Sequence, residues 1–478
     1  MPTKPTEGGD ALFGHARRGW FWGVADQFAQ RGLTMIVTIV LARLIEPAAF
    51  GLIASVSIFL GVAQQLIDGG ISQRVLQKSE IGDREYAALF WANGAVSFIC
   101  GAALISVSGV IAGFFGYPEL RGIISALAIS LMLFNAGRVQ MTWLIRELRF
   151  RTVSLISIVA ITTGCVVGVA MAILGYGVWS LIGQQLVLSV MRAVLLWSVV
   201  PYRPRGLPRW IDIRDLYAFG LPVVSSQVVR LACAQLINVL MVTRISATML
   251  GFFDRGKIIP QNLAYSLVNL FGRSNFPALA RLQADEPAFA QLFLRFLSVS
   301  SATYFMLLMG LAVCAENVVR VLLGDQWLPS VWFMQASCVA FMIYIVFTAN
   351  AELLRAKGRT RNYFRHNMTC ALCQVTGVLA GMSWGAQGMV IGDIIGRAVS
   401  CLLIIPAVGK ISDVTLFAQC RVLLFPLVGG IVVAAPLWGI QQLGGPEWAR
   451  LLASGFVGLL LMLAYWQVMN RYGPFKQS

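Results

Sequence analysis

The chain of 478 residues is 58% hydrophobic and only 12% charged, with a mean hydropathy of +0.75. This composition excludes an ordinary soluble protein of this length and indicates an integral membrane protein. The formal net charge of +16 comes from basic residues spread over short loops between apolar segments, a pattern that orients a membrane protein and does not indicate a nucleic-acid partner.

Apolar segments follow one another from residue 20 to residue 470, and each is long enough for a membrane-spanning helix of ~20 residues. The predicted spans are 20–44, 48–72, 86–115, 120–145, 153–175, 178–200, 216–243, 248–278, 288–323, 331–353, 364–384, 387–408, 417–441 and 448–470. We therefore predict an all-α integral membrane fold with about fourteen transmembrane helices.

A proline- and arginine-rich break, PYRPRGLPRWIDIRD, divides these segments into two sets that begin alike. The polar residues Gln27 and Gln30 of the first helix are matched, at one constant offset, by Gln227 and Arg230 of the seventh. This pattern predicts a duplicated six-helix unit. The predicted domains are a cytoplasmic N-terminus at 1–19, an N-lobe of six helices at 20–200, a cytoplasmic hinge at 201–215, a pseudo-symmetric C-lobe at 216–409, and two further helices with the C-terminus at 410–478.

Most of the basic residues fall in alternate loops, on the side that holds the N-terminus. The positive-inside rule then places both termini in the cytoplasm. The opposite loops are short, and Gly175-Tyr176-Gly177 and Trp384-Gly385-Ala386 are hardly more than turns. We therefore expect no catalytic domain there, and we predict that the protein is not an enzyme; the P-loop, GxSxG and HExxH motifs are absent from the sequence.

Several basic residues lie inside apolar spans, where a charge costs at least ~2.5 kcal/mol and needs a cavity or a partner. Arg31 and Arg230 fall near mid-bilayer in equivalent helices, which predicts an anion clamp. A polar stripe about 60° wide follows the eighth span through Arg255, Asn262, Ser266, Asn269 and Arg273. A weaker stripe in the second span runs through Ser57, Gly61, Gln64, Gln65 and Asp68.

These patterns predict that the first, second, seventh and eighth helices wall a hydrated, cationic central cavity, with a structural polar network between packed helices as the alternative. The predicted cavity residues are Arg31, Arg230, Arg255, Lys257, Arg273, Gln27, Gln227, Asn262 and Asn269. Asp26, Asp68 and Asp254 are candidates for a proton or sodium relay, although a nearby cation or helix end also explains each of them. No cofactor or metal is expected, and Cys370 and Cys373 are interpreted as packed thiols because no second pair accompanies them.

Three segments, RELRFRTVSLISIVA, GYGVWSLIGQQLVLSVMRAVLLWSVVPYRPR and NFPALARLQ, resemble the polysaccharide-transporter branch of the multidrug/oligosaccharidyl-lipid/polysaccharide exporter superfamily. The resemblance implies a two-lobed, V-shaped flippase in the bacterial inner membrane. Its substrate would be an undecaprenyl-diphosphate-linked sugar, which it would move from the cytoplasmic to the periplasmic leaflet by alternating access, with the last two helices forming a groove for the polyprenyl tail. Its implied partners are the lipid-linked glycan, membrane lipids and the polysaccharide polymerase or export machinery.

The charge pattern and the resemblance together predict export of exopolysaccharide, capsule or O-antigen precursors. Three alternatives stay open. An ion-coupled small-molecule antiporter could share the fold, although the first helix has no clear acidic cluster beyond Asp26. A membrane polymerase or ligase of the same pathway would need a larger periplasmic loop. A non-transporting scaffold would leave the charged stripe of the eighth span without a purpose.

Overall fold

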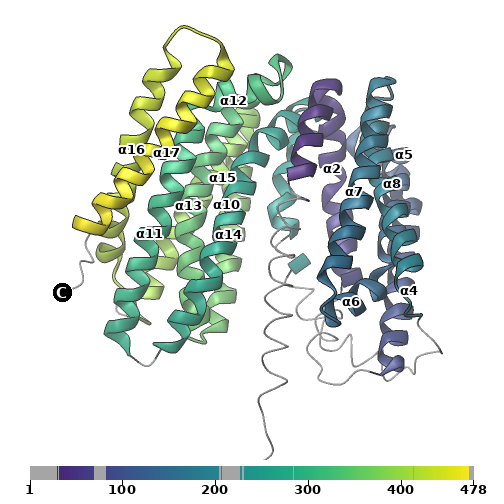
Figure 1. Cartoon of the computed structure of the whole chain (residues 1–478), viewed down its shortest axis with the longest axis horizontal. Helices are drawn as coiled ribbons and strands as arrows, with labels where there is room; N and C mark the ends of the chain where they lie inside the picture. The colour runs from purple at the N-terminus through teal and green to yellow at the C-terminus, as the bar shows by residue number, and fades with distance from the viewer. Residues whose placement is uncertain are drawn as a thin grey trace, which may run out of the picture. The chain divides into compact units, whose positions relative to one another are not determined.

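The computed structural model describes residues 30, 32–68, 82–203, 206, 227–228, 231–283, 285–412 and 414–472, and leaves undescribed the side chains at 269–274, 276–277, 360 and 468–472. Every regular element in these residues is a helix (Figure 1), so the predicted all-α class is confirmed. The chain divides into two compact units, Met1–Ala232 and Cys233–Ser478.

The helices of the first unit follow the predicted apolar segments. They are α2 (Pro47–Asp68), α4 (Asp83–Phe115), α5 (Leu120–Asn135), α6 (Arg138–Arg146), α7 (Phe150–Ile173) and α8 (Val178–Val199), with a shorter apolar helix at Gly32–Leu44. The segment expected as one span at 120–145 is interrupted between α5 and α6. The break exposes the Ala136 carbonyl, which accepts a hydrogen bond of 3.0 Å from Trp197 Nε1.

The second unit contains most of the helix Leu231–Arg244 and all the helices that follow. These are α10 (Ala247–Arg281), α11 (Glu286–Val313), α12 (Ala315–Leu322), η1 (Asp325–Trp327), α13 (Ser330–Ala356), α14 (Thr360–Gly381), η2 (Met382–Trp384), α15 (Gly385–Gly409), α16 (Leu416–Gln441) and α17 (Glu447–Tyr472). The expected single span at 288–323 is wrong, because the helix is interrupted at Cys314 and α12 begins a new, shorter helix.

Ten helical segments of the described chain are long and apolar enough to cross a membrane, and one of them, Arg361–Gly409, contains both α14 and α15. The total of fourteen spans stays a prediction. The 35-residue α10 is missing from these ten segments, although it is longer than any other described helix. Its sequence is therefore less apolar than its length would lead us to expect.

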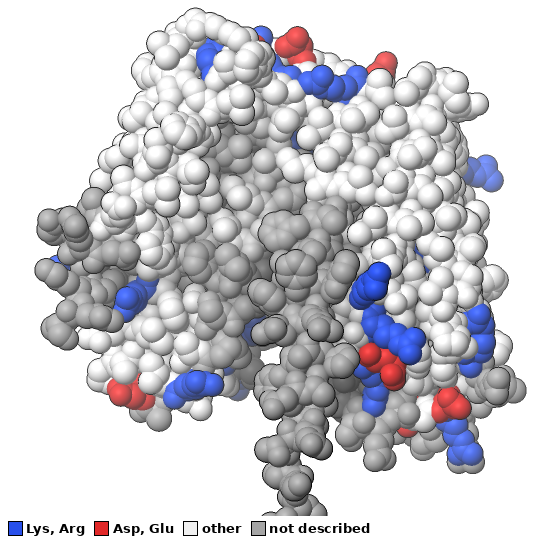
Figure 2. Space-filling view, viewed as in Figure 1, with Lys and Arg blue, Asp and Glu red and all other residues white. Residues whose placement is uncertain are grey.

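The outer surfaces of the helices are apolar. On α17, Leu452, Phe456, Leu459 and Leu463 are each more than half exposed. On the face shown in Figure 2, most charged side chains of the described residues gather near the helix ends, and the surface between them is largely uncharged. An uncharged band of this kind suits contact with lipid.

The predicted hinge at 201–215 lies mainly outside the described residues, and the predicted domain bounds stay predictions. The described part packs onto the first unit: the ring of Tyr202 lies 5.0 Å from that of Tyr86 and 6.3 Å from that of Trp143, measured between centroids. Burial, helped by the negative charge of Asp83, raises the pKa of Tyr202 to about 12. Tyr202 is therefore neutral and fixes the start of this segment against α4 and α6.

Candidate functional site

One face of α10 packs closely against α13. Leu250, Phe253 and Ala264 are buried on this face. A Cβ atom on Gly256 would lie 2.8 Å from the Ser330 carbonyl oxygen and 2.9 Å from Phe333 Cβ, so only glycine permits this approach. Ser246 caps the start of the helix by accepting a hydrogen bond of 3.2 Å from the Met249 amide.

The predicted polar stripe lies on the opposite face of α10. At 100° per residue, Arg255, Asn262 and Ser266 fall on the side of the helix away from Leu250, Phe253 and Ala264. Asn262 is exposed, and Arg255 and Ser266 are half-buried. The stripe therefore faces away from α13, as expected for a surface that contacts water or a ligand.

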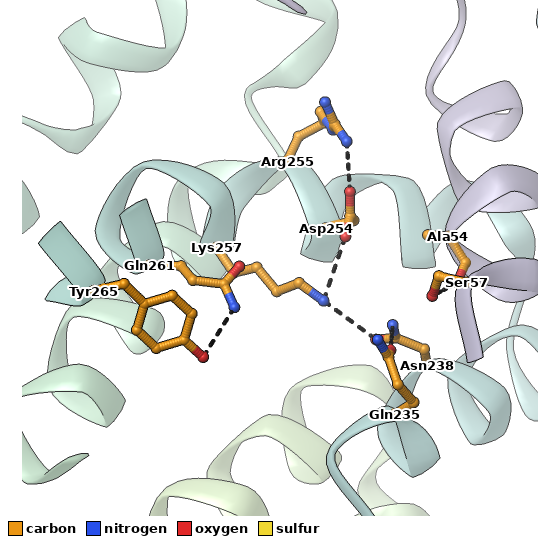
Figure 3. Close-up of polar contacts among 9 residues, drawn as sticks. All are labelled: Ala54, Ser57, Gln235, Asn238, Asp254, Arg255, Lys257, Gln261 and Tyr265. Atoms are coloured by element: carbon orange, nitrogen blue, oxygen red, sulfur yellow. Dashed lines mark hydrogen bonds and ion pairs between the residues drawn. The ribbon is translucent and has the colours of Figure 1, made fainter. Parts of the chain in front are cut away.

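A second polar row runs beside this stripe, and the sequence analysis did not identify it. Asp254, Gln261 and Tyr265 follow one another at spacings of seven and four residues, which places them on one side of the helix. Gln261 Nε2 donates a hydrogen bond of 3.4 Å to the Tyr265 hydroxyl, and Figure 3 shows the two side chains together. The same helical spacing that revealed the first stripe could have revealed this one.

Asp254 joins two cations of α10 (Figure 3). Its Oδ2 lies 2.7 Å from Arg255 Nη2, and its Oδ1 lies 3.3 Å from Lys257 Nζ. The three side chains are 14–21% exposed. One carboxylate beside two cations leaves the group with one positive charge in excess.

Lys257 does not belong to the stripe. Its Nζ donates a hydrogen bond of 3.3 Å to Asn238 Oδ1 in the helix Leu231–Arg244 and lies 4.6 Å from the centre of the Phe253 ring. Asn238 in turn donates to Gln235 Oε1. These contacts fit the structural alternative for Lys257, whereas Arg255 lies on the polar face, where its side chain is 14% exposed.

In the first unit, Asp68 pairs with a basic residue far from it in sequence. Its carboxylate forms an ion pair with Arg138 at the start of α6, and its Oδ1 accepts a hydrogen bond of 3.0 Å from Gln64 Nε2. This contact ties α2 to the break between α5 and α6. The predicted role of Asp68 in ion coupling stays a prediction.

The predicted mid-bilayer clamp lies outside the described residues. Arg31, Arg230, Gln27 and Asp26 are not described, and Gln227 is described as a half-buried helical residue. The backbones of Asn269 and Arg273 continue α10, but their side chains are not described.

Two other polar groups inside the helices have partners in α14 and α15. Arg397 Nε lies 2.8 Å from Asp393 Oδ2 one turn away on α15. The Cys370 thiol accepts hydrogen bonds from Gln374 and Ser400. In the described ranges no group of three or more His, Cys, Asp or Glu side chains could hold a metal ion.

Comparisons with known proteins bear on the family. A family model described as polysaccharide biosynthesis protein matches residues 40–332. The chain is 25% identical to lipopolysaccharide biosynthesis protein WzxC of Escherichia coli (strain K12), over 78% of this chain and 76% of that protein. It is 27% identical to succinoglycan biosynthesis transport protein ExoT of Rhizobium meliloti (strain 1021), over 64% of this chain and 62% of that protein.

Solved structures show the same fold. The lipid II flippase MurJ, in an inward closed conformation, matches with a TM-score of 0.74 and 10% identity, over 94% of this chain and 99% of that one. An inward-facing multidrug resistance MATE family transporter matches with a TM-score of 0.61 and 13% identity, over 82% and 94% of the two chains. Because the family model covers more than half of the sequence, this multi-pass membrane protein belongs to the polysaccharide biosynthesis family, in the polysaccharide-transporter branch of the multidrug/oligosaccharidyl-lipid/polysaccharide exporter superfamily.

Proposed function

We propose that this protein is a flippase that moves an undecaprenyl-diphosphate-linked oligosaccharide across the bacterial cytoplasmic membrane, for the synthesis of exopolysaccharide, capsule or O-antigen. The names of the relatives support a role in polysaccharide export. The observation that carries the proposal is α10, a long helix whose polar face, turned away from its packing partner, carries Arg255 within a group of three charged residues that has one positive charge in excess.

The diphosphate is the part of the substrate that this face suits. Arg255 presents a guanidinium group, which matches phosphate oxygens in pairs. Its present partner is the Asp254 carboxylate, at 2.7 Å, which lowers the cost of keeping a cation inside a membrane helix. An arriving diphosphate would compete with this carboxylate, so Asp254 keeps the arginine oriented between transport events.

The neighbouring polar rows suit the sugar. Asn262, Gln261 and the Tyr265 hydroxyl offer hydrogen-bond donors and acceptors along one stretch of helix. The ring of Tyr265 packs 5.9 Å from Phe341 and 5.8 Å from Tyr344, between ring centroids, which holds the hydroxyl in place. The polyprenyl tail would stay in the bilayer while the protein alternates between two access states.

Orientation and energy source form part of the same proposal. The basic loops place both termini in the cytoplasm, and the glycan reaches the protein from the cytoplasmic leaflet. A proton or sodium gradient could drive the cycle through Asp254, Asp68 or Asp26. The product then passes to a polymerase or to export machinery.

The test is polymer production by cells that carry single substitutions. Arg255→Ala should lower polymer yield roughly tenfold to a hundredfold, because a charge-assisted hydrogen bond contributes about 1.5–3 kcal/mol. Arg255→Lys should retain part of the yield, since it keeps the charge and loses the paired geometry. Arg121→Ala, at an exposed position at the start of α5, is the matched control and should be unaffected.

Membrane levels of each variant, measured by immunoblot, separate loss of transport from loss of protein. Normal polymer from Arg255→Ala at normal protein level would contradict the role of this face. The predicted clamp has its own test: replacing Arg31 and Arg230 by Ala together should abolish export while the protein remains in the membrane.

A further inference from the structure

The corner after α6 and the corner after α13 have the same backbone hydrogen bonds. The Leu148 amide donates to Ile145 at 3.1 Å and the Arg149 amide to Leu144 at 2.9 Å. In the second corner, the Gly358 amide donates to Arg355 at 3.0 Å and the Arg359 amide to Leu354 at 2.9 Å. This is the Schellman motif. The two corners therefore have the same hydrogen-bond geometry, and we compare them as matched corners.

The two corners differ at the residue that must adopt the left-handed conformation. In the second corner this is Gly358, with φ of 67°, whereas in the first it is Leu148, with φ of 54°. Within the described part of the chain, Leu148 has the one positive φ outside glycine. A leucine Cβ is strained in this conformation and glycine is not. Backbone strain of this kind persists where the strained residue has a role in function or binding.

Leu148 gains little from the rest of the protein. Its side chain is 44% exposed. It is surrounded by basic residues: Arg149 is exposed, with its guanidinium carbon 5.1 Å from the centre of the Trp143 ring, and Arg146 and Arg151 lie on either side. Glu147 is the single acidic residue between 146 and 151.

The second corner has both exposed and paired cations: Arg359 and Arg361, the counterparts of Arg149 and Arg151, are exposed, whereas Lys357 and Arg355 form ion pairs. Lys357 is 7% exposed, and its Nζ lies 2.6 Å from Glu286 Oε1 and 3.1 Å from the Gln283 carbonyl oxygen. Arg355 pairs with Glu352 at 2.7 Å. The second corner therefore has glycine where the first has a partly exposed leucine. Two of its cations, Lys357 and Arg355, have partners within the protein.

We propose that the corner at 146–151 binds anionic phospholipid headgroups, with Leu148 inserted among the acyl chains and Arg146, Arg149 and Arg151 around the phosphates. The corner joins two membrane-spanning segments, Leu120–Arg146 and Phe150–Ile173, so it lies where a bilayer surface begins. Arginine stems can lie along apolar surface while their charges reach the headgroups. The strained leucine then has a partner that the isolated protein does not provide.

The test is lipid binding by the full-length protein. Purified wild type and variants are titrated with phosphatidylglycerol or phosphatidylcholine, and bound lipid is counted by native mass spectrometry. Wild type should prefer phosphatidylglycerol. Leu148→Ala, which keeps the backbone conformation but removes most of the apolar side chain, should weaken binding of both lipids. Arg149→Gln and Arg151→Gln should each weaken only phosphatidylglycerol binding, by about fivefold.

Gly358→Ala is the matched control, because it introduces strain at the second corner and leaves 146–151 intact. Its lipid preference should equal that of wild type. Unchanged phosphatidylglycerol binding in the Leu148 and arginine variants would overturn the proposal, and so would an equal loss in Gly358→Ala.

Discussion

The hairpins α7–α8 and α14–α15 follow the two matched corners, and glycine brings their helices together in different ways. In α7–α8, glycines on both helices meet a mixture of backbone and side chain: a Cβ atom on Gly164 would lie 2.8 Å from the Gln184 carbonyl oxygen, and a Cβ atom on Gly183 would overlap the Met171 thioether. In α14–α15 glycine faces glycine. A Cβ atom on Gly377 would overlap the Gly392 carbonyl, and a Cβ atom on Gly392 would overlap the Gly377 carbonyl.

The difference indicates that α14–α15 is the more rigid of the two hairpins. Small residues let membrane helices approach closely. Some neighbours in α7–α8, such as the Met171 thioether, are side chains that can move, whereas the close neighbours of Gly377 and Gly392 are backbone, which cannot move without shifting the whole helix. The second hairpin should therefore tolerate much less change than the first.

The largest expected effect comes from Gly392→Ala. The added methyl group meets backbone, which should cost about 3 kcal/mol of unfolding free energy. Gly183→Ala, in the α7–α8 hairpin, meets the flexible Met171 thioether and should cost less than about 1 kcal/mol. Thermal unfolding in detergent, with membrane expression as a second readout, compares the two. Equal shifts would show that the hairpins are equally rigid.

Buried side-chain amides provide a second comparison between the two units. Asn350 of α13 and Gln419 of α16 exchange two hydrogen bonds of 3.0 Å. Gln140 of α6, which lies as far before the first corner as Asn350 lies before the second, is fully buried, but neither side-chain atom has a partner in the structure. α16 therefore provides a partner in the second unit that Gln140 lacks.

Isosteric substitutions should act in opposite ways at these positions. Asn350→Leu should destabilise by about 2 kcal/mol, because it leaves the Gln419 amide buried and unpaired. Gln140→Met should be neutral or stabilising, because it removes two unpaired polar atoms. Chemical or thermal unfolding measures both. A loss from Gln140→Met as large as that from Asn350→Leu would mean that a buried water serves as the missing partner.

The smallest effect concerns the strained corner. Without anionic lipid, Leu148→Gly should raise the free energy of unfolding by about 1 kcal/mol, because glycine adopts the left-handed conformation without strain. Gly358→Leu should lower it by a similar amount. Unfolding midpoints in a zwitterionic detergent check the pair, and a destabilised Leu148→Gly would show that the leucine contributes packing instead of strain.

The sequence predicted the helices well because long apolar runs can do little else in a bilayer. It missed two details inside these spans: the span expected at 120–145 is present as Leu120–Arg146 but has a break at Ala136–Gly137, and the span expected at 288–323 ends at Val313, before α12. No apolar periodicity marks these interruptions. Hydrogen bonds and ion pairs with distant residues, such as Trp197 with Ala136 and Asp68 with Arg138, accompany the first one.

The candidate site was predicted in part. Helical spacing places Arg255 and Asn262 on one side of α10, because the period of a helix is fixed, and their predicted role in binding stays a prediction. It did not predict that the Asp254 carboxylate pairs with both Arg255 and Lys257. Nor did it predict that Lys257 donates a hydrogen bond to Asn238 on another helix. Contacts of this kind depend on side-chain direction and on packing between helices, which a single sequence does not specify.

The most direct test of the central claim is transbilayer movement of a fluorescent undecaprenyl-diphosphate oligosaccharide in vesicles that contain the purified protein. Movement should require the protein, should be slowed roughly tenfold or more by Arg255→Ala, and should be unaffected by Arg121→Ala. Movement of the lipid at the same rate in vesicles with wild type, with Arg255→Ala and without protein would contradict the account.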